Sequence, residues 1–199
     1  MAFLNYKPSR KNKRQRGVGM IEVLVSITIS AFALLGLAGL QVASLRYQKV
    51  ANFRSLASQY AADMADRIRA NASAVTTSAT SANYATYDTS SDQYSTSPPS
   101  TAPACDGAVA VCGTSQAVAT KDIYDWRVAL NTALAGGWGT ITQPAANPLN
   151  LTNPITITIY YNEPDKKLGG TTDPNCVASV LPSGVDPTAI RCVTTTVLP

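Results

Sequence analysis

One apolar run constrains this chain more than any other feature. From Val18 to Leu40 the sequence holds 23 residues and a single charge, that of Glu22. A helix of this length, at about 1.5 Å per residue, can cross the roughly 30 Å hydrocarbon core of a bilayer. Before the run lie six cations and no acid: Lys7, Arg10, Lys11, Lys13, Arg14 and Arg16. The positive-inside rule then predicts a single-pass protein whose later residues lie outside the cytoplasm.

Three interpretations of the run remain open at this point. A secretory signal peptide is the weakest, because its apolar region has only about 7–15 residues. An ordinary signal anchor is the second interpretation. The third depends on Glu22, since a carboxylate inside a membrane span costs a few kcal/mol and normally has a partner and a purpose.

The residues around Glu22 match a known processing signal. Basic residues, then Gly17, then the segment Val18-Gly19-Met20-Ile21-Glu22-Val23-Leu24-Val25 resemble the class III signal of type IV prepilins and type II secretion pseudopilins. The resemblance implies that a prepilin peptidase cuts after Gly17 and methylates the new amino terminus at Val18. Val18 departs from the Phe or Met usual at that position. In a packed bundle of apolar helices, Glu22 can pair with the amino terminus of an adjacent subunit and so set the axial register.

The helical pattern continues past the apolar run. Apolar residues recur at steps of three and four from Val42 to Ile68 with polar residues between them, which predicts one helix over residues 18–72, transmembrane in 18–40. Its last residues, Asp66-Arg67-Ile68-Arg69-Ala70-Asn71, resemble the end of the first helix in PilV-type minor pilins. Taken alone, the same residues also describe a solvated helix end with Asp63–Arg67 and Asp66–Arg69 pairs.

Residues 73–121 are predicted to form a Ser/Thr-rich loop between helix and sheet. Tyr84, Tyr87 and Tyr94 lie in it, and we expect them to anchor the loop to the sheet, with contact to a partner as the alternative.

Four cysteines follow the apolar run: Cys105, Cys112, Cys176 and Cys192. An even number beyond a membrane span predicts two disulfides in an oxidising compartment. A zinc site is disfavoured because the spacing is unusual and the chain has no His. Three pairings are possible, and proximity in sequence favours Cys105–Cys112 and Cys176–Cys192.

Residues 122–199 are predicted to form a helix and an antiparallel sheet with the second disulfide. A helix is expected from Asp122 to Ala135, with Trp126 in the core and Gly136-Gly137 as its stop. Alternation predicts a half-buried strand over 155–161 and a weaker one over 189–198. The fold class is therefore α+β. The resemblance implies the type IV pilin fold, a long amino-terminal helix packed on a small antiparallel sheet.

The sequence indicates no catalytic, cofactor or metal site. Without His there is no Ser/His/Asp or Cys/His arrangement. Asp165, Asp173 and Asp186 could bind calcium, but they lie in predicted turns where Asp is expected anyway. Beyond residue 17 the chain has 10 basic and 12 acidic residues, which does not indicate nucleic-acid binding.

The resemblance implies a function in assembly. The basic leader would be residues 1–17, and the mature chain would be a minor pilin that helps initiate or cap a type IV pilus used in twitching and adhesion. Its partners would be other minor and major pilins through the amino-terminal helix, the prepilin peptidase and the inner-membrane assembly platform. It would reside in the bacterial inner membrane with a periplasmic head and then at the pilus tip. Alternatives are a minor pseudopilin of a type II secretion system, an adhesin that binds through residues 73–103, and an ordinary bitopic membrane protein.

Overall fold

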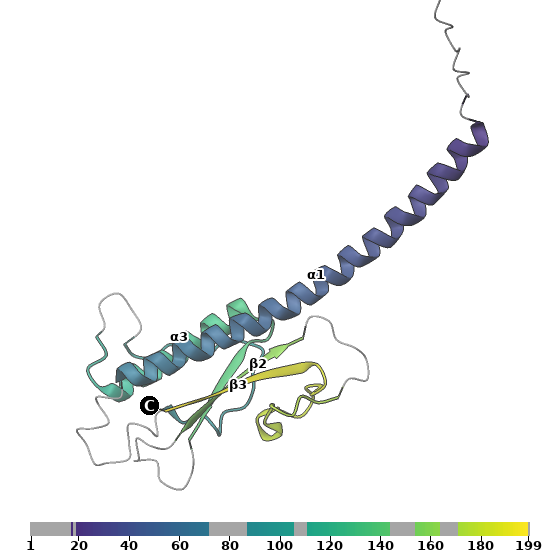
Figure 1. The fold of residues 1–199 in the computed structure, drawn as a ribbon. Helices are drawn as coiled ribbons and strands as arrows, with labels where there is room; N and C mark the ends of the chain where they lie inside the picture. Colours follow the sequence, from purple (N-terminus) through teal and green to yellow (C-terminus); the bar gives the residue numbers. More distant parts are fainter. Residues whose placement is uncertain are drawn as a thin grey trace, which may run out of the picture. The chain divides into compact units, whose positions relative to one another are not determined.

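The computed structural model describes residues 17, 19–71, 87–105, 111–143, 154–163 and 171–198. The basic leader before Gly17, Val18, Tyr84 and Asp165 lie outside these residues. In chain order the elements are α1 (Met20–Asn71), α3 (Ser115–Ala133), β1 (Trp138–Thr142), β2 (Ile155–Asn162), the short 3-10 helix η2 (Ala178–Val180) and β3 (Ile190–Val197) (Figure 1).

Helix α1 confirms the predicted long amino-terminal helix. It has 52 residues, with Glu22 in its first turn and Arg69 in its last, both placed favourably for the helix dipole. The chain divides into two compact units within this helix, Met1–Leu45 and Arg46–Pro199. The second unit contains the last part of α1 and everything after it, and we call it the head.

The head contains a three-stranded antiparallel sheet in the order β1-β2-β3. Trp138 pairs with Tyr160 across β1 and β2, and Ile159 pairs with Val193 across β2 and β3. Strand β1 was not predicted, because Gly136 and Gly137 suggested only a turn. The turn is there, with Gly136 at a φ of 60°, a conformation that costs glycine little.

The main core lies between the head part of α1, helix α3 and one face of the sheet. Small and apolar residues of α1 pack there, among them Ala57, Ala61, Met64 and Ile68. Trp126 of α3 is 1% exposed, as predicted, and its indole N–H donates to the Tyr60 carbonyl at 2.9 Å. This arrangement is the pilin-like α+β fold.

Strand β2 is buried on both faces, so the prediction of a half-buried strand was wrong. Thr158 and Tyr160, expected to face solvent, are 2% and 0% exposed. Irregular segments cover this second face, where the Tyr94 ring lies 6.2 Å from that of Tyr160 and the Tyr94 amide donates to the Val180 carbonyl. Tyr94 is buried against Tyr160 of the sheet, which confirms the anchoring prediction for this residue. Tyr87 is also buried, but its hydroxyl forms hydrogen bonds with Asn71 of α1 and Asp122 of α3.

Helix α3 begins at Ser115, seven residues before the predicted start at Asp122. Thr114 caps it by accepting a hydrogen bond from the Ala117 amide at 3.2 Å, a standard use of a threonine side chain at a helix start. The apolar periodicity begins only at Ile123, because the first two turns of α3 carry small and polar residues.

Candidate assembly and processing site

The predicted cleavage residue, Gly17, lies just before α1. A β-carbon built at position 17 would meet nothing within 4 Å. The described part of the fold therefore does not require glycine at position 17. Val18, the predicted new amino terminus, lies outside the described residues.

Glu22 lies in the first turn of α1. Its amide donates to the Gly19 carbonyl at 2.9 Å, and its own carbonyl accepts from the Ser26 hydroxyl at 2.7 Å. Ser30 repeats the pattern by donating to the Ser26 carbonyl. Among the residues that the structure describes, the Glu22 carboxylate forms no salt bridge, so the helix dipole is the one favourable field that the fold supplies to it.

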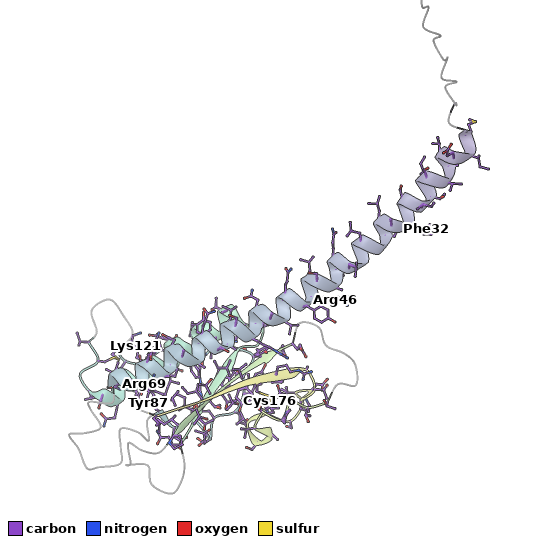
Figure 2. The ribbon with its side chains drawn as sticks, viewed as in Figure 1. Phe32, Arg46, Arg69, Tyr87, Lys121 and Cys176 are labelled. Atoms are coloured by element: carbon purple, nitrogen blue, oxygen red, sulfur yellow. A yellow bond between two sulfur atoms is a disulfide. The ribbon has the colours of Figure 1, made fainter. Side chains whose placement is uncertain are left out.

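The first part of α1 exposes apolar side chains along its length. Met20 is 89% exposed and Phe32 is 75% exposed (Figure 2). No charged residue occurs between Glu22 and Arg46. Within the described chain, α1 is the one helix long and apolar enough to cross a membrane, judged by length and composition. Such a surface requires lipid or other helices around it.

The end of α1 is tied to the rest of the head. Arg67 donates to Asp63 on its own helix at 3.0 Å and to Asp122 of α3 at 3.3 Å. Ile68 is buried in the core, whereas Asp66 and Arg69 form an exposed pair. The segment that resembles PilV-type pilins is therefore only partly a solvated helix end.

Asn71 extends this network. Its side-chain amide donates to the Tyr87 hydroxyl at 3.1 Å and to the Ser115 carbonyl at 2.9 Å. The Tyr87 hydroxyl in turn donates to Asp122 at 2.8 Å. Burial is the main reason why the pKa of Tyr87 lies above its ordinary value. Together with Arg67, these contacts join α1, α3 and the segment that contains Tyr87.

Two disulfides hold irregular parts of the head. Cys105 is bonded to Cys112 and Cys176 to Cys192, the pairs that proximity in sequence favoured. The second bond connects the segment after residue 171 to strand β3, where the Cys192 amide also donates to Asp173 at 3.1 Å.

The aspartates considered for calcium have local roles where they are described. Asp173 accepts from the Asn175 amide and Asp186 from the Thr188 amide, each at 3.0 Å. In the described part of the chain, no group of three or more His, Cys, Asp or Glu residues is placed to hold a metal ion.

Arg127 is a buried cation that the sequence did not indicate. Arg127 donates to the Gly139 carbonyl at 3.0 Å and to Asp92 at 2.7 Å, and its guanidinium lies 4.3 Å from the centre of the Trp138 ring. Burial lowers the pKa of Arg127. No spacing could have revealed it, because its partners come from two other segments, strand β1 and the segment that contains Asp92.

The amino-terminal geometry described above coincides with a recognised motif. Residues 12–38 match the family model of the prokaryotic N-terminal methylation motif. The chain therefore carries an N-terminal methylation motif, the kind of signal found in type IV prepilins and pseudopilins. No curated protein and no solved structure matches the chain.

The motif and the fold agree on the class of protein. The motif implies processing by a prepilin peptidase and assembly with pilins. The chain's single amino-terminal apolar helix is consistent with an inner-membrane prepilin.

Proposed function

We propose that this pilin-family protein is a PilV-like minor pilin of the type IV pilus. It would be stored in the inner membrane with its head in the periplasm and would then help to initiate or cap the pilus at its tip. The observation that carries the proposal is the contact network of Arg67 and Asn71 with α3 and Tyr87. It gives a structural role to the segment that resembles PilV-type pilins.

Assembly would follow from the amino-terminal residues. Cleavage after Gly17 would free an amino terminus at Val18, and methylation would follow. In lipid the Glu22 carboxylate is costly, and no described residue forms a salt bridge with it. Next to the amino terminus of a neighbouring subunit it would be paired, which favours the filament. The apolar side chains of α1 would exchange lipid for neighbouring helices in the same step.

The amino-terminal sequence and the intact mass of the membrane-extracted protein test the processing step. We expect a chain that starts at Val18, with a mass lowered by the leader and raised by one methyl group. Gly17→Val should block cleavage. Gly19→Val is the matched control, because position 19 has room for a side chain, with only Ile21 in ordinary contact. A wild-type chain that starts at Met1 or Ala2 would show an ordinary membrane anchor and remove the proposal.

A deletion strain separates the pilus from the alternative, a minor pseudopilin of a type II secretion system. We expect loss of surface pili and of twitching, with secretion of enzymes unchanged, and rescue by the wild-type gene but not by Glu22→Leu. Normal pili together with blocked secretion would assign the chain to the secretion system instead.

A further inference from the structure

Two buried hydrogen-bond donors of the head lie close together. They are Nη2 of Arg127 in α3 and the indole Nε1 of Trp138 at the start of strand β1. Both residues are only 7% exposed, and neither nitrogen atom touches solvent. Among the residues that the structure describes, no atom accepts a hydrogen bond from either nitrogen. Buried N–H groups nearly always have an acceptor, in the protein or in ordered water, so this pair calls for one.

The other nitrogen atoms of the Arg127 guanidinium are engaged. Nε donates to the Gly139 carbonyl at 3.0 Å, and Nη1 donates to Asp92 at 2.7 Å. These two bonds fix the plane of the guanidinium, so Nη2 cannot turn toward another acceptor without breaking one of them. The Asp92 side chain is 43% exposed, so solvent reaches the outer side of this ion pair.

The indole of Trp138 is also held in place. The Arg127 guanidinium lies 4.3 Å from the centre of its ring, a favourable contact that supplies no lone pair to an N–H group. Trp138 pairs with Tyr160 across β1 and β2. Tyr94 packs in the same cluster, and its hydroxyl donates to the Gly136 carbonyl at 2.9 Å. The protein therefore fixes both donors without completing their hydrogen bonds.

We propose that one internal water molecule accepts hydrogen bonds from Arg127 Nη2 and Trp138 Nε1 and thereby joins α3 to strand β1. A water oxygen has two lone pairs, one for each donor, and internal waters typically bind such buried polar groups. Bonds of about 2.9 Å suit two donors whose parent groups are this close. The site is independent of the proposed pilus role.

Charge and access favour water over other ligands. Asp92 already neutralises Arg127, so an added anion would place a further charge in the interior without a partner, at a high cost. A side chain of another protein cannot reach either nitrogen while the head keeps this structure, because both atoms are shielded from solvent. A small neutral acceptor meets both conditions.

The chain has two tryptophans, which gives the test an internal control. The Trp126 indole is equally buried, but it donates to a protein acceptor, the Tyr60 carbonyl. Nuclear Overhauser effects between water and the two indole protons are recorded on the full-length, isotope-labelled chain in deuterated detergent micelles. We expect a cross-peak to water for Trp138 and none for Trp126. The absence of a cross-peak at Trp138 would overturn the site.

Arg127→Lys keeps a positive charge beside Asp92 and removes Nη2, so the Trp138 cross-peak should be lost. Asn131→Ala is the matched control, because Asn131 lies one turn further along α3 and donates to the Thr96 carbonyl, in the segment that also contains Asp92. The control should keep the cross-peak. An unchanged cross-peak in Arg127→Lys would show water bound by the indole alone, and loss in both variants would tie the signal to the packing of that segment. Either result overturns the shared site.

Chloride is the other small acceptor that two N–H donors can hold. Replacing chloride by gluconate at equal ionic strength should leave the Trp138 indole signal in place. A shift that follows the chloride concentration would overturn the water site in favour of an anion site. If Arg127→Lys fails to fold, as shown by loss of the Trp126 signal from its wild-type position, the wild-type comparison of the two indoles decides the question.

Discussion

Gly139 in strand β1 lies directly against the ring of Trp126. A β-carbon at this position would overlap the far edge of the indole ring and lie 2.9 Å from a methyl carbon of Leu130. Both neighbours are buried parts of α3, so neither has free space to move into. The close packing of α3 on the sheet therefore depends on glycine, which has no side chain, at position 139.

Replacing Gly139 by Ala should destabilise the head by about 1–3 kcal/mol, because a well-packed core tolerates added atoms poorly. Urea unfolding followed by circular dichroism measures the change. Gly113→Ala serves as the control, since a β-carbon there meets nothing within 4 Å. Equal stability of the two variants would show that α3 can shift away from β1 at little cost.

The sequence revealed Trp126 but not the residues that surround it. A tryptophan on the apolar face of a helical pattern is a reliable core prediction. The role of Gly139 and the burial of Arg127 depend on which segments pack together, and no local pattern records that. The same limit applies to Asn71, whose partners Tyr87 and Ser115 are 16 and 44 residues away.

At the scale of elements, Thr89 covers part of the outer edge of strand β1. The Thr89 amide donates to the Ile141 carbonyl at 2.9 Å, and the Ile141 amide donates to the Thr89 hydroxyl at 2.8 Å. Thr89 thus satisfies both edge groups of Ile141 and blocks further pairing at that point.

Thr89→Val keeps the shape of this side chain and removes its hydroxyl. We expect a loss of roughly 1–3 kcal/mol, because the buried Ile141 amide would be left without an acceptor. Thr89→Ser, which keeps the hydroxyl, should lose clearly less. Thermal unfolding of both variants checks the prediction, and equal loss in the two would mean that the methyl group matters and the hydrogen bond does not.

Periodicity revealed the elements that have one apolar face and missed those that do not. Helix α1 and strands β2 and β3 were predictable from their apolar spacing. Strand β1 has five residues, two of them threonines, and no alternation long enough to recognise. The second face of β2 is covered by irregular segments around Tyr94 and Val180, and irregular segments have no period to detect.

At the scale of the whole molecule, the two units differ in the environment that they require. The described side chains from Met20 to Leu45 are exposed, whereas the head has its own cores on both faces of the sheet. The amino-terminal unit therefore requires a non-aqueous or filament environment, and the head does not.

A fragment of residues 46–199 should consequently fold without detergent and be monomeric, with Cys105–Cys112 and Cys176–Cys192 formed. Size-exclusion chromatography, circular dichroism and mass mapping of the disulfides test this. The full-length chain in the same buffer, expected to aggregate, is the comparison. An unfolded fragment would show that residues before Arg46 contribute to the stability of the head.

The absence of charge between Glu22 and Arg46 has a consequence for how a stored subunit leaves the bilayer. Before processing, an outward pull on the helix would draw six leader cations through hydrocarbon, at a cost of about 2.5–3.5 kcal/mol for each. After a cut behind Gly17, the same pull moves only Glu22 and the new terminal amine, which carry opposite charges. Cleavage by the peptidase would therefore lower the free-energy cost of extracting the subunit toward the periplasm, compared with extracting the uncut chain.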